Sequence, residues 1–248
     1  MQNKALNDML IKECYKKYQK RYNLTLPEIQ KINYYYDDEV SANFNADDLY
    51  NKRYILNVNY ELLSCNKKYI KQNLFHEFTH LTDSLDFLDK NFKEFKNVMC
   101  SYSEFHSAKR EMVERIEEIE DDNITLDSQV EYEDGKRTIK DIIDIDFNLM
   151  EEDLDMMSKN NDEDNFFYRT NRIYYFYGHI STLNSFNINY NINLNNIPEC
   201  FREQILVVQD SLLNDNIEID NILKSYLDLQ EKIMYKCIEN MKEQISLQ

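Results

Sequence analysis

Two histidines and a glutamate lie together in the segment His76-Glu77-Phe78-Thr79-His80, an HExxH pattern. In a helix, His76 and His80 lie one turn apart on nearly the same side, so their imidazoles can converge on one tetrahedral zinc ion. Glu77 then lies about 100° around the helix from His76, where its carboxylate can act as a general base toward water. The chain has only 4 histidines, and two of them fall in this pattern. We therefore predict a zinc site, with Glu77 as the catalytic base.

A catalytic zinc site needs a third protein ligand, and four acidic residues compete for that position. Glu104, near the start of the next expected helix, gives the spacing HExxH-x23-E and is the favoured ligand. Glu111 lies two turns further along the same side and is the reserve. Asp83 lies on the histidine side of its helix, where we expect it to accept a hydrogen bond from an imidazole. Asp86 could reach the ion only if the chain turned after the motif, and such a turn would need a glycine at position 83. The chain has Asp83 there, so we expect the helix to continue and Asp86 to point away from both histidines.

Hydrophobic periodicity predicts the elements that must carry these residues. Apolar residues at steps of three and four predict helices over 3–22, 67–88 and about 102–119. Residues 29–36 and 53–58 are rich in β-branched and aromatic side chains, so we expect strands there, joined by a polar loop.

A small hairpin is expected near 129–140, because Asp134-Gly135 favours a type I′ turn. The polar stretch 151–165 predicts a short helix followed by a linker. Helices are expected over 166–185, from Pro198 onward, and over 216–245. The fold class is thus α+β and mainly helical, with a lobe over 1–150 that contains a small sheet and a helical C-terminal lobe over 151–248.

An aromatic segment within the second lobe offers candidates for a further catalytic role. His179 and Tyr175 lie in it and could stabilise an oxyanion, as electrostatic donors do in acyl transfer. The alternative is an aromatic core helix without a catalytic role. His106 faces away from Glu104 on its helix, which favours a surface or packing histidine.

Composition excludes several classes of protein. The formal net charge of -17 would repel duplex nucleic acid, and no apolar run approaches the roughly 18 residues of a membrane span. The first 12 residues lack the pattern of a secretory signal. The 5 cysteines are scattered without a CxxC pair, which favours reduced thiols in a cytoplasmic protein. The acidic runs 117–122 and 151–155 are solvated faces, or else they attract a basic partner.

The HExxHxxD run from His76 to Asp83, followed by SExxxA from Ser103 to Ala108, resembles the gluzincin class of zinc metallopeptidases. Within that class it is similar to small intracellular families, including the ImmA/IrrE-type peptidases and the mitochondrial inner-membrane processing peptidases. The resemblance covers about residues 1–120. It implies a zincin-like catalytic lobe, zinc ligation by His76, His80 and Glu104, and Glu77 as base. Many larger members carry an Asp four residues after the Glu ligand, whereas this chain has Ala108.

Two functions from different classes follow. The first is a zinc-dependent intracellular endopeptidase that acts on a protein or peptide substrate, with a basic one suited to the acidic surface. The second is an acidic binding or decoy protein that captures a basic partner and keeps a structural or vestigial zinc site. The motif alone also leaves open a zinc hydrolase acting on a non-peptide amide.

Overall fold

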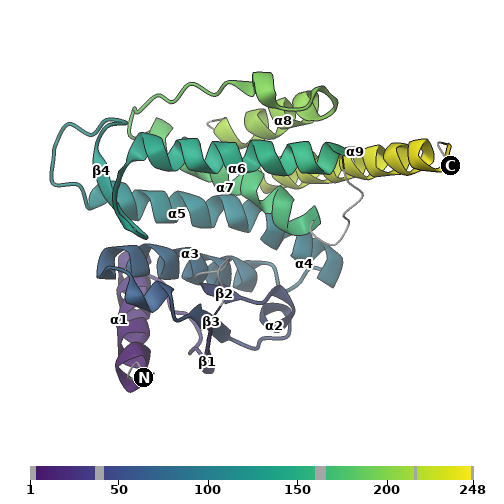
Figure 1. Ribbon diagram of the computed structural model, residues 1–248. Helices are drawn as coiled ribbons and strands as arrows, with labels where there is room; N and C mark the ends of the chain where they lie inside the picture. Colours follow the sequence, from purple (N-terminus) through teal and green to yellow (C-terminus); the bar gives the residue numbers. More distant parts are fainter. Residues whose placement is uncertain (1–3, 37–41, 160–165, 215–216, 247–248) are drawn as a thin grey trace. The chain divides into compact units, whose positions relative to one another are not determined.

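The structure, a computed structural model, describes residues 4–36, 42–159, 166–214 and 217–246 (Figure 1). The helices are α1 (Lys4–Tyr22), α2 (Ala46–Tyr50), α3 (Lys67–Asp86), α4 (Phe92–Val98), α5 (Glu104–Glu117), α6 (Ile139–Lys159), α7 (Phe166–Ser185), α8 (Glu199–Leu213) and α9 (Ile219–Ser246). The strands are β1 (Lys31–Tyr35), β2 (Ala42–Phe44), β3 (Ile55–Asn59), β4 (Gln129–Tyr132) and β5 (Gly135–Thr138). The predicted class, α+β and mainly helical with a small sheet, is confirmed.

Contacts along the chain define two compact units. The first consists of Met1–Met99 with Arg110–Thr138, and the second of Cys100–Lys109 with Ile139–Gln248. The lobe boundary expected at residue 150 falls inside α6, whereas the change between the units comes just before that helix begins. Helix α6 is one continuous amphipathic element that packs on α7 and α9, so the whole helix belongs with them.

The first unit contains a mixed sheet with the strand order β1-β3-β2. β1 runs parallel to β3, and β2 runs antiparallel to it. Both strands predicted from β-branched and aromatic residues are therefore present. β2 and α2 fall in the segment expected to be a polar loop. Asn45 begins α2 by accepting hydrogen bonds from the backbone of Asp47 and Asp48, a capping pattern that the Asn-x-Asp-Asp sequence encodes.

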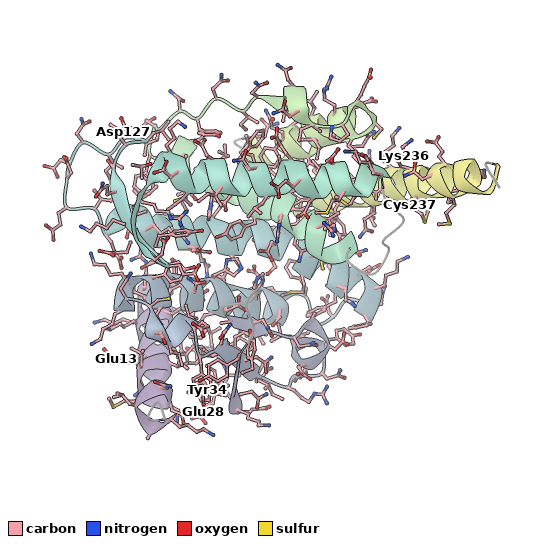
Figure 2. The ribbon with its side chains drawn as sticks, in the orientation of Figure 1. Glu13, Glu28, Tyr34, Asp127, Lys236 and Cys237 are labelled. Atoms are coloured by element: carbon pink, nitrogen blue, oxygen red, sulfur yellow. The ribbon has the colours of Figure 1, made fainter. Side chains whose placement is uncertain are left out.

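Helix α1 packs on α3 through buried aromatic rings. Tyr18 is fully buried, and its ring centroid lies 5.2 Å from that of Phe75 and 5.6 Å from that of Phe78. Its hydroxyl lies 3.1 Å from the Oγ1 atoms of both Thr79 and Thr82. At the other end of α1, Tyr34 of β1 donates to Asp8 at 2.5 Å (Figure 2 labels Tyr34). These contacts position α3, which carries the HExxH residues, against the rest of the first unit.

The helix predicted over about 102–119 corresponds to α5. A π-helical turn, Met99–Ser103, leads directly into it. The expected apolar stripe is buried, with Phe105, Ala108, Met112 and Ile116 at most 2% exposed. π-Helical turns are rare and are frequent at functional sites. Here the turn comes immediately before the favoured third ligand, Glu104.

The hairpin expected near 129–140 forms, but its turn differs from the prediction. Tyr132 pairs with Gly135, so Glu133 and Asp134 form the loop instead of Asp134 and Gly135. A type I′ turn needs positive φ at both central residues, and Asp134 is not among the residues with positive φ. Within the described hairpin, Gly135 is the residue with positive φ, at 140°, at the first position of β5. The Asp-Gly pair therefore marks the hairpin but is offset by one residue.

Helices α6 to α9 form the predicted helical bundle of the second unit (Figure 1). The short helix predicted within 151–165 is wrong in extent, because α6 already begins at Ile139. Residues 160–165, the expected linker, lie outside the described residues. Pro198 precedes the first residue of α8, as predicted for a proline at a helix start.

Gly178 of α7 lies close to the backbone of the segment 100–109. A Cβ atom on it would lie 2.5 Å from the carbonyl oxygen of Phe105 and 2.7 Å from Cβ of Ala108. The side chain of Thr182 donates to the carbonyl of Lys109 at 3.1 Å, one helical turn further along α7. Glycine at position 178 thus permits close helix packing within the second unit.

Within the described residues, no helix has the combination of length and apolar character needed to cross a bilayer.

Candidate metal centre

Helix α3 positions the HExxH residues as the periodicity predicts. It begins after Asn66, whose side chain accepts from the backbone N–H of Tyr69 at 2.9 Å. Its apolar stripe is buried, with Ile70, Leu74 and Phe78 at most 2% exposed. The stripe anchors α3 and thereby sets the direction in which the two histidines point.

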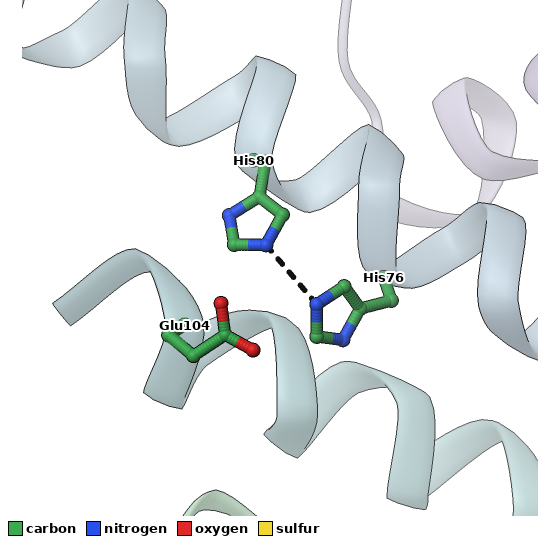
Figure 3. Close-up of side chains that lie close together, drawn as sticks. All are labelled: His76, His80 and Glu104. Carbon is green, nitrogen blue, oxygen red and sulfur yellow. Dashed lines mark hydrogen bonds between the residues drawn. The ribbon is translucent and has the colours of Figure 1, made fainter. Parts of the chain in front are cut away.

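His76 and His80 bring the same ring atom to one point. Their Nε2 atoms are 3.0 Å apart and hydrogen-bonded, and their ring centroids are 4.8 Å apart at an interplanar angle of 75° (Figure 3). Two nitrogens bound at about 2.0–2.1 Å to one tetrahedral zinc ion are about 3.4 Å apart. A small rotation of either ring would therefore suffice to admit an ion between the two Nε2 atoms.

Glu104 completes the group from the first residue of α5. One ligand atom from each of His76, His80 and Glu104 lies within 4.8 Å of the others, and Figure 3 shows the carboxylate directed toward the rings. His76 is buried and the other two are half-buried. Two imidazoles and one carboxylate are a ligand set of catalytic zinc sites, which leave a fourth position for water. These residues could hold a metal ion, and their donor types fit zinc.

Glu111, the reserve third ligand, lies on the opposite side of the His76 ring. Its Oε2 atom is 3.1 Å from Nδ1 of His76, not from the Nε2 atom that faces His80. Its other oxygen pairs with Arg115. Among the described residues, the group able to hold a metal includes Glu104 and does not include Glu111.

Glu77 is buried, and its carboxylate contacts the edge of the sheet. The backbone N–H of Phe44 in β2 donates to its Oε2 atom at 3.1 Å. This donor restricts the orientation of the carboxylate. Glu77 lies between the two histidines in sequence, and the strand that orients it falls in a segment expected to be a loop.

The remaining acids of α3 are not in the group that could hold a metal, as far as the described residues show. Asp83 is 2% exposed. Its expected hydrogen bond to an imidazole stays a prediction. Asp86 is the last residue of α3 and is exposed. The helix continues through position 83, so the turn that Asp86 would need as a ligand does not occur.

The aromatic segment of the second lobe forms helix α7, with Ile173, Tyr174, Phe176 and Tyr177 fully buried. His179 is also fully buried, and its Nδ1 lies 2.7 Å from Oδ2 of Asp146 on α6. The ring of Tyr175 lies 4.4 Å from that of His179. These packing contacts agree with a core helix, and a role of His179 and Tyr175 in oxyanion stabilisation stays a prediction. His106 of α5 is half-buried against Tyr102, with ring centroids 5.6 Å apart.

Two features of the site could not be found by sequence reasoning. The Phe44 amide is a backbone group, so the identity of the residue does not predict its hydrogen bond to Glu77. Arg115 lies four residues after Glu111, which is a spacing for helical ion pairs, but that signal is common on exposed helices. Burial of both partners distinguishes this pair, and only the folded chain shows it.

Comparisons of the chain with protein-family models, with curated proteins and with solved structures find no match.

Proposed function

We propose that this protein is a zinc-dependent intracellular endopeptidase, with His76, His80 and Glu104 as zinc ligands and Glu77 as general base. The observation that carries the proposal is the convergence of two imidazoles and a carboxylate from the start of α5, with a buried glutamate between the histidines in sequence. The expected resemblance to gluzincin-type peptidases of the ImmA/IrrE kind is part of the proposal and supplies the choice of peptide bonds as substrate.

Each residue has a defined task in this proposal. A zinc ion in such a site lowers the pKa of a bound water to about 7 and polarises a carbonyl. Glu77 accepts the proton of the attacking water and then delivers it to the leaving amine, so the reaction needs no covalent intermediate. The Phe44 amide binds one oxygen of Glu77 and so restricts the orientations of the carboxylate before the reaction. His179 and Tyr175 are the proposed donors to the oxyanion.

The proposed substrate is a protein or peptide of basic character, because the chain has a formal net charge of -17. A strongly negative surface accelerates encounters with cations. The proposed compartment is the cytoplasm, since all 5 cysteines are free thiols and reduced thiols are typical of that environment.

The decisive experiment combines metal analysis with protein terminomics. Wild-type protein purified without chelator should contain about one zinc per chain. Cells expressing it should show new peptide termini that cells expressing Glu77→Gln lack. A wild-type protein without zinc, or identical termini in the two cell lines, would contradict the proposal.

The second candidate is an acidic binding protein with a structural zinc site, and the net charge favours it. A structural site does not need Glu77 as a base. Stoichiometric zinc together with unchanged cellular effects of Glu77→Gln would favour this candidate over the peptidase.

A further inference from the structure

The two ring nitrogens of His76 face different partners. Nε2 faces His80, and Nδ1 lies 3.1 Å from Oε2 of Glu111, two helical turns after Glu104 on α5. This is an ion-pair distance; a hydrogen on Nδ1 donated to this carboxylate would leave the Nε2 lone pair for a metal. The carboxylate thus lies where it can select both the tautomer and the rotation of the ring.

Glu111 is itself held by a buried arginine. Its Oε1 atom pairs with the guanidinium of Arg115, and the two residues are 3% and 2% exposed. The guanidinium carbon lies 5.3 Å from the ring centroid of Tyr132 in β4 and 6.0 Å from that of Tyr69 in α3. The guanidinium therefore lies beside both aromatic rings, and it neutralises a carboxylate that would otherwise be costly to bury.

Glu114, on the next turn of α5, gives a natural comparison. It is 1% exposed and bridges Arg21 of α1 at 2.6 Å and Lys71 of α3 at 2.7 Å. It is as buried and as fully paired as Glu111, but its ion pairs are with side chains outside the metal group. A buried and paired carboxylate on α5 therefore need not contact a histidine. Of these two glutamates, Glu111 is the one with a contact to His76.

We infer that Glu111 is a positioning residue for His76 and that Arg115 keeps Glu111 in place. The inference rests on the proposed zinc site, because it assigns the Nε2 atom of His76 to the metal. It goes beyond that proposal by giving the site a support drawn from the same helix that provides the third ligand. Helix α5 then contributes both the proposed third ligand, Glu104, and this support, Glu111.

The test measures zinc affinity in the full-length protein by competition with a chromophoric chelator. The variants are Glu111→Ala, Glu111→Gln and Arg115→Met, with Glu114→Gln as the matched control. We expect about a 10- to 100-fold loss of affinity in Glu111→Ala, the usual effect of removing the partner of a ligating histidine. Glu111→Gln keeps an acceptor oxygen, so its loss should be smaller than in Glu111→Ala but still more than about twofold, and Arg115→Met should shift affinity in the same direction. Glu114→Gln should lower the melting temperature but leave zinc affinity within about twofold.

Cobalt substitution gives a second readout that is independent of catalysis. The visible absorption of the Co²⁺ protein should change in Glu111→Ala and remain as in wild type in Glu114→Gln. Zinc affinity in a folded Glu111→Ala or Glu111→Gln within twofold of wild type would overturn the positioning role. A loss as complete as that of His80→Ala would also overturn it, because Glu111 would then be a ligand. Absence of zinc binding in wild type would instead refute the proposed metal site, and with it this inference.

Discussion

The backbone N–H of Phe44 donates a hydrogen bond to Oε2 of Glu77 at 3.1 Å, and both residues are about 8% exposed. Phe44 ends the edge strand β2, whose other side pairs with β3. The proposed general base is therefore connected directly to the sheet. This contact determines what the glutamate variants should do.

Glu77→Gln should retain the fold and the zinc but lose hydrolysis. The amide keeps an oxygen that can accept from the Phe44 N–H, but it cannot take a proton from water. Loss of a general base typically costs about 10²- to 10⁴-fold in rate. Zinc content, thermal unfolding and peptide-terminus formation should be measured together.

Glu77→Ala serves as the matched comparison, because it also removes the acceptor. The buried N–H of Phe44 then loses its partner, which should cost about 1–3 kcal/mol of unfolding free energy relative to Glu77→Gln. Equal stability of the two variants in urea titrations would show that the contact with β2 contributes nothing.

Removal of a ligand should abolish zinc binding while the rest of the protein stays folded. His80→Ala and Glu104→Ala each leave two of three donors, so zinc should no longer be retained through dialysis. Asp86→Ala removes an exposed carboxylate of α3 and should keep about one zinc per chain. Zinc bound to wild type should also raise the melting temperature, and chelator should reverse that rise. Retention of zinc by Glu104→Ala would assign the third ligand elsewhere.

Gly178→Ala should destabilise the protein by about 1–3 kcal/mol, although alanine is the better helix former by about 1 kcal/mol. The steric effect wins because the new Cβ would meet the carbonyl oxygen of Phe105 at 2.5 Å, and a backbone atom cannot move aside. Ser181→Ala, on the same helix, should change stability by less than about 0.5 kcal/mol. Urea unfolding of both variants measures the difference, and a Gly178→Ala protein as stable as wild type would show that the helices can separate slightly.

Lys109 should give a measurable pH dependence of stability. Burial lowers the pKa of its ammonium group below the ordinary value of 10.5, since the charged form is poorly solvated. The folded state therefore carries a penalty at neutral pH, and this penalty falls as the pH rises through the lowered pKa toward 10.5. Lys109→Met should be more stable than wild type at pH 7, and its advantage should shrink by pH 10.

Urea titrations at both pH values test this expectation. Lys93→Met removes an exposed charge of α4 and controls for the change in net charge. A Lys109→Met advantage that stays constant between pH 7 and pH 10 would mean that packing, and not the charge, causes it.

Sequence patterns were most informative where one helix face is buried. The apolar steps of α3 and α5 predict both helices and their core stripes, and the spacing after the HExxH pattern favours Glu104. Patterns failed where short elements lack a period. β2 has three residues, which are too few to show an alternation of apolar and polar side chains. The hairpin turn differs from the prediction by one residue, because the pairing between β4 and β5 determines which residues form the loop.

The sequence by itself determined that His76 and His80 share one side of a helix, because the helical repeat alone sets that relation. Only the tertiary structure decided which carboxylate meets which ring nitrogen. Glu104 and Glu111 lie on the same side of α5 and are equivalent in a periodic pattern, but their distance along the helix places one near the Nε2 atoms and the other at Nδ1 of His76. That assignment depends on the register between two packed helices, which is set by the burial of side chains on both and not by the residues of either one.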